Sequence, residues 1–258
     1  MKFVQTAERI SQVEESDHVI FQRSLFAYHE ASKLVGNTML EVGTGMGYGL
    51  EILAPCVTSY IAIDKYSSPL IEQNKDNPDF SFHQMKVPPF SNLQNEWVDH
   101  VVTFQVIEHI NKDELFIKEI HRILKIGGSL ILTTPNIRMS LTRNPWHVRE
   151  YTVMQLKQLL SGYFKEVNIL GVYGNEKVLR YYEENKHSVQ QFTRFDVLNL
   201  QYWLPRKVLQ IPYDLLNRIN RRKLLKMSRD ETKDISIQDF YLKEADDNCF
   251  DLFAIAVK

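Results

Sequence analysis

The chain has 258 residues, of which 44% are apolar and 24% are charged, with 31 Lys and Arg against 32 Asp and Glu. This composition is ordinary for a globular protein, and the net charge of −1 argues against a general nucleic-acid binder. Two cysteines, Cys56 and Cys249, are too few for a disulfide framework or a multi-thiolate zinc site and fit a reducing compartment. The first 17 residues lack the apolar core of a signal peptide, and no apolar run approaches the roughly 18 residues of a membrane span. We therefore expect a cytoplasmic protein without a metal site.

Strands and helices alternate along most of the chain. Apolar periodicity predicts a first helix over 18–35, which Gly36-Asn37 ends. Short apolar runs predict strands at 38–42, 59–63, 80–84, 100–106, 129–133, 167–172 and 249–257. Helices are expected through 50–53, over 69–75, between 111 and 127, and from 152 to 160. The third of these should begin with a capping box of Asn111 and Glu114 and end at Gly127-Gly128.

This alternation predicts an α/β fold, a doubly wound and mostly parallel sheet of seven strands. The alternation is interrupted over 174–247, a stretch rich in Tyr, Asn and charged residues that should form a helical insertion or lid before the last strand. The expected organisation is an N-terminal helical segment at 1–37, an α/β core at 38–173, the insertion at 174–247 and a final core strand at 248–258.

The most informative segment follows the first strand, where Gly43, Gly45, Gly47 and Gly49 alternate with other residues. Glycine lets a ligand approach the backbone closely. The dinucleotide fingerprint G-x-G-x-x-G fails in both possible registers, and no Lys-Ser or Lys-Thr follows to make a phosphate loop. Asp64 ends the second strand, where a carboxylate can accept hydrogen bonds from ribose hydroxyls. The two features together describe a nucleoside ligand without phosphates.

With Glu41 preceding the glycines and Ile107-Glu108-His109 following the fourth strand, the pattern resembles the class I S-adenosylmethionine-dependent methyltransferases. It is most similar to their small-molecule subgroup of the methyltransferase type 11 kind. The resemblance implies a Rossmann-like sheet whose last strand is antiparallel, and S-adenosyl-L-methionine as cofactor. The cofactor-binding residues that it implies are Glu41, Gly43, Thr44, Gly45 and Gly47 around the methionine end and ribose, Asp64 at the ribose hydroxyls, Lys65 and Tyr66 beside the adenine, Gln84 and Met85 at the adenine edge, and Gln105 and Val106 beside the methionine.

One of these positions departs from the family pattern. Gln84 stands where the family has an acidic residue, but its side-chain oxygen can still accept a hydrogen bond from the adenine amino group.

Two histidines are candidates for a general base. His109 follows the fourth strand, and His147 lies in a segment after the fifth strand, where substrate enters in such folds. Ordinary structural explanations stay open for both: His109 could cap or pack at the start of the next helix, and 145–151 could be a loop held by its own aromatic residues.

A basic cluster occupies 215–229, with six basic residues and no acidic one. Its interleaved apolar residues are typical of an amphipathic helix on an anionic membrane, and equally of a surface helix packed on its own domain.

These features predict an enzyme that transfers a methyl group from S-adenosylmethionine to a hydroxyl or amine of a small molecule, such as a glycan, a lipid-linked acceptor or a secondary metabolite. Two alternatives remain: a non-catalytic module that binds the cofactor, and a nicotinamide-dependent oxidoreductase.

Overall fold

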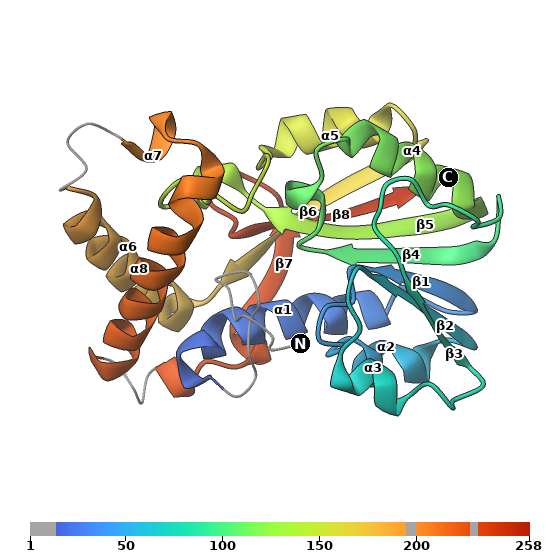
Figure 1. Cartoon of the computed structure of the whole chain (residues 1–258), viewed down its shortest axis with the longest axis horizontal. Helices are drawn as coiled ribbons and strands as arrows, with labels where there is room; N and C mark the ends of the chain where they lie inside the picture. Colours follow the sequence, from blue (N-terminus) through green and yellow to red (C-terminus); the bar gives the residue numbers. More distant parts are fainter. Residues whose placement is uncertain (1–13, 195–199, 228–231) are drawn as a thin grey trace. The chain divides into compact units, whose positions relative to one another are not determined.

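The computed structural model describes residues 14–194, 200–227 and 232–258. They form one sheet in the order β3-β2-β1-β4-β5-β8-β6-β7 (Figure 1). Its strands are β1 (Thr38–Val42), β2 (Ser59–Asp64), β3 (Phe80–Gln84), β4 (Val98–Phe104), β5 (Leu124–Pro135), β6 (Glu166–Gly174), β7 (Phe240–Glu244) and β8 (Asp251–Val257). The α-helices are α1 (His18–Ser32), α2 (Leu50–Leu53), α3 (Pro69–Gln73), α4 (Asp113–Ile123), α5 (Val153–Ser161), α6 (Glu176–Thr193), α7 (Leu200–Trp203) and α8 (Arg206–Met227).

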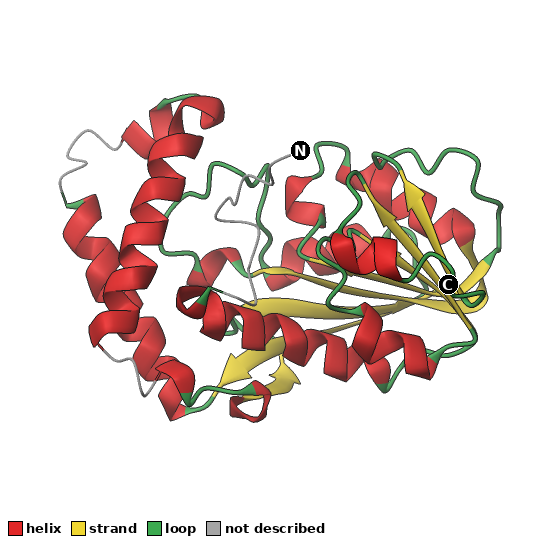
Figure 2. Ribbon diagram, turned by 60° about the horizontal axis from the view of Figure 1, so that its bottom comes forward, coloured by secondary structure: helices red, strands yellow, loops and turns green. Residues whose placement is uncertain are grey.

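Strand direction confirms the α/β class. Strands β3, β2, β1, β4 and β5 pair in parallel, whereas β8 lies antiparallel between β5 and β6. Helices α4 and α5 cover one face of the sheet, and α2 and α3 cover the other (Figures 1 and 2). Strands that are covered on both faces are mostly apolar, as the burial of the parallel strands β1 and β2 and of the antiparallel β8 shows.

The sheet has eight strands rather than the seven expected. The additional strand, β7, lies within the predicted helical insertion, at the edge of the sheet beside β6. Its sequence, FYLKE, exposes three of its five side chains, so it lacks the continuous apolar run that identified the other strands. The rest of the insertion is largely helical, as expected, in α6, α7 and α8.

The predicted ends of α4 and of β4 are wrong. Lys112 is the N-cap of α4 and makes no side-chain capping bond, so Asn111 and Glu114 form no capping box. The helix ends at Ile123, because the buried Leu124 turns to an extended conformation and pairs with Val98. Gly127 and Gly128 therefore lie within β5 instead of ending the helix.

Strand β4 begins and ends two residues earlier than expected, and Gln105, which follows it, has a φ of 54°. This left-handed conformation cannot continue a strand. By contrast, α5 begins where it was expected, directly after Thr152, which forms a capping box with Gln155.

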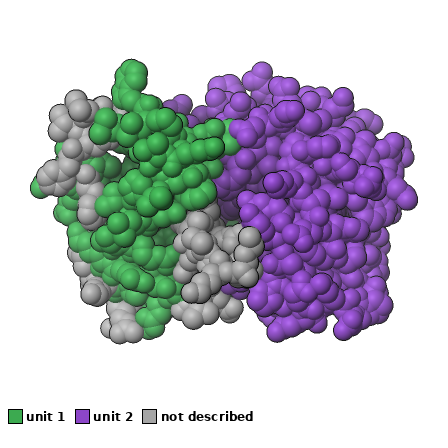
Figure 3. Space-filling view, in the orientation of Figure 1, with its two compact units in different colours: residues 1–26, 140–148, 173–241 green, residues 27–139, 149–172, 242–258 purple. Residues whose placement is uncertain are grey.

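The chain divides into two compact units (Figure 3). Unit 1 comprises residues 1–26, 140–148 and 173–241, and unit 2 comprises residues 27–139, 149–172 and 242–258. Unit 2 contains the glycine-rich loop, the parallel strands and β8. Unit 1 contains α6, α7 and α8.

Unit 1 uses part of the basic cluster for its own packing. Arg221 Nη1 lies 2.7 Å from Asp17 Oδ1, and the side chains of both residues are largely or fully buried. Arg218 and Arg222 lie 3.7 and 3.5 Å from carboxylate oxygens of Glu14. Arg229 lies outside the described residues. The basic cluster is therefore not a uniformly exposed charged surface. Among the described helices, none combines the length and apolar character needed to cross a bilayer.

Candidate functional site

The glycine-rich loop joins β1 to α2 in unit 2. Gly43, Gly45 and Gly47 have φ values of +83°, +57° and +87°, a region that side chains rarely adopt. A Cβ on Gly43 would lie 2.3 Å from Cγ2 of Val106, so glycine is required there by contact as well as by conformation. At Gly45 the nearest atom to such a Cβ is 3.9 Å away, and a ligand can approach this part of the backbone.

Asp64 is fixed against the loop from the end of β2. Its Oδ2 accepts a hydrogen bond from Gly45 N at 2.9 Å, and its Oδ1 accepts one from Tyr66 N at 3.0 Å. The N–H groups of Gly43 and Thr44 donate to the carbonyl of Ile63, the residue before Asp64. The side chain is half-exposed, and each carboxylate oxygen can accept a second bond. The structure thus joins the two features that the sequence linked by spacing alone, and they fit a ribose.

Glu41 lies beneath this loop and is 1% exposed. Its Oε1 accepts a hydrogen bond from the Tyr28 hydroxyl at 2.7 Å, and its Oε2 accepts one from the Tyr60 hydroxyl. Burial raises the pKa of the Glu41 carboxyl, and the hydrogen bonds from neighbouring hydroxyls oppose that rise. Tyr28 belongs to α1, outside the predicted core, and no sequence motif connects it to Glu41.

The residues expected at the adenine gather beyond the ends of β2 and β3. Lys65 Nζ lies 5.3 Å from the ring centroid of Tyr66, which is 44% exposed. Gln84 Nε2 donates to the Lys65 carbonyl at 3.0 Å. This bond orients the amide, and its Oε1 atom can accept a hydrogen bond from a ligand. Met85 N donates to the Asp64 carbonyl at 2.9 Å.

The end of β4 contributes the residues expected at the methionine. Gln105 bonds twice to Thr133 of β5: its backbone N donates to the carbonyl at 3.0 Å, and its Nε2 donates to Oγ1 at 3.3 Å. Val106 faces Gly43. Glycine loop, Asp64, Gln105 and Val106 therefore meet at the carboxyl ends of adjacent parallel strands, where open α/β sheets bind ligands.

The two candidate bases are held in different ways. His109 ends a short 3-10 helix (Ile107–His109) directly after Val106, to whose carbonyl its backbone N donates at 2.9 Å. His147 belongs to unit 1, where its Nε2 lies 2.9 Å from Asn144 Nδ2 and its carbonyl accepts a bond from Arg206. Both side chains are half-buried. Only His109 is in the unit that contains the glycine loop.

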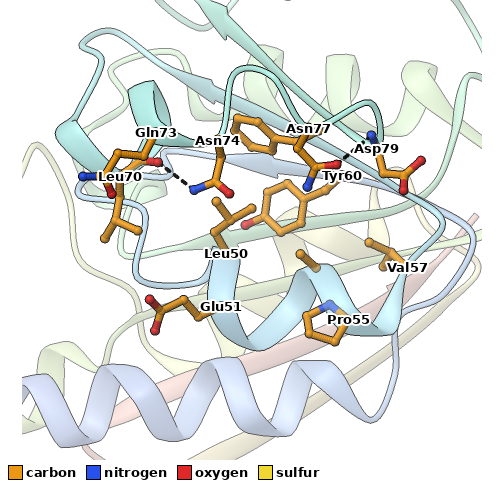
Figure 4. A pocket seen from close by; sticks show the side chains of 12 residues that line it. Leu50, Glu51, Pro55, Val57, Tyr60, Leu70, Gln73, Asn74, Asn77 and Asp79 are labelled. Atoms are coloured by element: carbon orange, nitrogen blue, oxygen red, sulfur yellow. Dashed lines mark hydrogen bonds between the residues drawn. The ribbon is translucent and has the colours of Figure 1, made fainter.

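A separate pocket of ≈ 610 Å³ lies on the α2 and α3 side of unit 2, near the amino ends of β2 and β3 (Figure 4). Its lining consists of Leu50, Glu51, Ala54, Pro55, Val57, Tyr60, Leu70, Gln73, Asn74, Asn77, Asp79 and Phe80. No expected cofactor residue lines it, so it is distinct from the candidate cofactor site. Tyr60 connects the two regions, since its ring lines the pocket and its hydroxyl binds Glu41.

The chain is similar to known methyltransferases. Residues 40–132 match a methyltransferase domain family. A probable S-adenosylmethionine-dependent methyltransferase of Mycolicibacterium smegmatis is 27% identical over 98% of this chain and 94% of its own length. A mitochondrial ubiquinone biosynthesis O-methyltransferase of Rattus norvegicus is 33% identical over 42% of this chain and 34% of its own length.

Solved structures share the fold. A methyltransferase of Thermotoga maritima, described as a possible histamine N-methyltransferase, superimposes with a TM-score of 0.54 at 16% identity, covering 92% of both chains. The chain belongs to the class I S-adenosylmethionine-dependent methyltransferases, enzymes whose cofactor is S-adenosylmethionine.

Proposed function

We propose that the protein methylates a hydroxyl or an amine of a small molecule in the cytoplasm, with its cofactor bound at the carboxyl ends of β1, β2 and β4. The observation that carries the proposal is the contact between Asp64 and the glycine loop, with Gln105 and Val106 beside it. Gly43, Thr44, Gly45 and Gly47 would surround the methionine and ribose, with the buried Glu41 beneath them. Asp64 would bind the ribose, and Lys65, Tyr66, Gln84 and Met85 would surround the adenine.

When bound, the cofactor supplies an electrophilic methyl group. The protein then has to align the acceptor atom with that group and exclude water. A hydroxyl acceptor also has to lose its proton, and His109 or His147 is proposed as the base; an amine needs only to be bound in its neutral form. Segment 174–247 is proposed to select the acceptor.

The class of acceptor is argued from charge and from one relative. A net charge of −1 provides no broad positive surface for a nucleic-acid substrate. The similar rat protein is an O-methyltransferase of ubiquinone biosynthesis, which supports a small acceptor. Glycans, lipid-linked compounds and secondary metabolites remain the candidate classes.

Methyl transfer can be followed with S-adenosylmethionine labelled in the methyl group and a bacterial lysate divided by dialysis. We expect label in the dialysable fraction or, for a lipid-linked acceptor, in an organic-solvent extract of the remainder. The rate should fall about a hundredfold in whichever of His109→Asn and His147→Asn removes the base. Binding of S-adenosylhomocysteine should be unchanged in both variants. His121→Asn is the control, because His121 lies on α4 against Phe164. Label in protein or nucleic acid would contradict the small-molecule proposal. Full rates in both variants would remove the proposed base, and no transfer at all would support a non-catalytic module.

We further propose that α7 and α8 contact an anionic membrane surface. Trp203, Ile211 and Leu215 are 82%, 80% and 61% exposed. Within α8, Ile211 and Leu215 recur with the exposed Val208 and Ile219 every three or four residues, so these four side chains share one helix face. Arg222 and Lys223 follow this face; Arg222 also lies 3.5 Å from Glu14, and Lys223 Nζ donates to Gln191 at 3.0 Å. Asp214, the acidic residue of α8, accepts a hydrogen bond from Trp146. An exposed apolar face next to positive charge fits anionic lipid.

Vesicle sedimentation tests this contact. We expect the protein to bind vesicles of mixed zwitterionic and anionic phospholipid, and the double variant Trp203→Ser, Ile211→Asn to lose about tenfold in affinity because apolar area is no longer buried. The matched control is Ile126→Asn, Met154→Asn, since both residues are 77% exposed outside this face. Equal binding by all three proteins would contradict the proposal. A dimer of the wild type that the double variant loses would instead identify the face as a self-association surface.

A further inference from the structure

The buried carboxylate of Glu41 is held at both oxygens by tyrosines from two different elements. Tyr28 of α1 donates to Oε1 at 2.7 Å, and Tyr60 of β2 donates to Oε2. A carboxylate that is 1% exposed needs such charge-assisted hydrogen bonds, because no water replaces them. Glu41 precedes Gly43 by only two residues, so its position also determines where the glycine loop starts.

Tyr28 contacts the far end of the same loop. A Cβ on Gly49 would come within 2.2 Å of the Tyr28 ring, which shows how closely ring and backbone approach. The ring also packs edge-on against Phe104 at a centroid distance of 4.9 Å, and Phe104 immediately precedes Gln105. One α1 side chain thus contacts both ends of the loop and the end of β4.

The protonation states suit this arrangement. Burial raises the pKa of Tyr28 and of Tyr60 well above the usual phenol value, and the Glu41 charge raises both further. Both phenols therefore keep the proton that they donate. Burial, with a smaller contribution from the nearby Asp64 charge, raises the pKa of the Glu41 carboxyl above its usual value, and the bonds from these hydroxyls oppose that rise. Ionised Glu41 thus depends on these hydroxyls.

We propose that Tyr28 and Tyr60 are positioning residues for cofactor binding: they hold the Glu41 carboxylate in place beneath the glycine loop. This makes α1, through Tyr28, a part of the cofactor site. The inference rests on the proposed role of Glu41 at the methionine end of the cofactor.

The test is calorimetric titration with S-adenosylhomocysteine across the range from about pH 5 to about pH 8.5, using Tyr28→Phe and Tyr60→Phe. Phenylalanine keeps each ring, including the Tyr60 ring that lines the pocket in Figure 4. We expect each variant to bind about tenfold more weakly near neutral pH, as for a lost hydrogen bond to a charged group. Since a lost donor raises the pKa of Glu41, affinity should also be lost at a higher pH than in the wild type as the pH falls.

Two further variants separate positioning from a general loss of stability. Tyr151→Phe is the matched control, because buried Tyr151 donates a hydrogen bond to Asp113 at 2.8 Å in the same unit. This variant should have a lower melting temperature but an unchanged affinity for S-adenosylhomocysteine. Glu41→Gln removes the carboxyl that titrates. Adding Tyr28→Phe to Glu41→Gln should therefore not change the pH dependence of ligand affinity any further.

The inference is overturned if both tyrosine variants keep the wild-type affinity and pH dependence, or if Tyr151→Phe weakens binding equally. Failure of the wild type to bind S-adenosylhomocysteine would have a different meaning, because it would overturn the proposed cofactor site and this inference with it.

Discussion

Replacing Asp64 by alanine is expected to weaken the binding of S-adenosylhomocysteine at least about a hundredfold. The carboxylate has two tasks at this position: it accepts the Gly45 N–H at 2.9 Å, and it is proposed to accept the ribose hydroxyls. Hydrogen bonds to a charged group contribute about 1.5–3 kcal/mol each, and every 1.4 kcal/mol is about tenfold in affinity. Calorimetric titration measures the loss.

Asp79→Ala is the matched control for this experiment. Asp79 is an exposed acidic residue of the same unit, but it lines the separate pocket near the amino end of β3. Its replacement should leave the affinity unchanged. NADH should bind to none of the proteins, since the loop lacks a dinucleotide fingerprint. Unchanged affinity in Asp64→Ala would place the ribose elsewhere, and binding of NADH alone would contradict the cofactor assignment.

Gly43→Ala is expected to destabilise the protein by about 2–5 kcal/mol, because two costs combine at this residue. Alanine at a φ of +83° is strained, which costs about 1–2 kcal/mol. Its Cβ would also lie 2.3 Å from Val106 Cγ2, and overpacking of this kind costs about 1–3 kcal/mol. Urea unfolding followed by circular dichroism measures the change.

Two comparisons divide this effect into its parts. Gly45→Ala has positive φ but open space, so it should cost only the strain of about 1–2 kcal/mol while obstructing the ligand. Adding Val106→Ala to Gly43→Ala should remove the overpacking and restore part of the lost stability. If Gly43→Ala is no less stable than Gly36→Ala, where φ is not positive and a Cβ meets nothing within 4 Å, both the strain and the overpacking are contradicted.

The sequence predicted some elements to the residue and missed the ends of others for physical reasons. Strands β1 and β3 match their expected bounds. Strand β1 lies between Asn37 and Gly43, whose φ values of 47° and 83° cannot continue a strand. The end of α4 was missed, since pairing of Leu124 with Val98 depends on a partner distant in sequence. Gly127-Gly128 is a strong local stop signal, but tertiary pairing ended the helix before it was reached.

The same distinction holds at the candidate site. Spacing alone placed Asp64 near the glycine loop, since carboxyl ends of adjacent parallel strands share one edge. It could not find Tyr28, because the helix periodicity only assigned this residue to an apolar face. The hydrogen bond between Tyr28 and Glu41 arises from the packing of α1 against β1 and is seen only in the structure, where Glu41 is buried.

The antiparallel strand β8 has a consequence for how the protein folds. It pairs with residues 129–135 of β5 and 166–172 of β6. However, it begins at Asp251, whereas β5 ends at Pro135. Bringing the ends of a segment of more than about a hundred residues together costs conformational entropy before the hydrogen bonds of the paired strands contribute any stability. Until β8 arrives, β5 and β6 have no strand between them, and their unpaired edges are open to other chains. The sheet is therefore completed late in folding. The risk of aggregation is greatest before that step, while β8 has not yet been synthesised and paired.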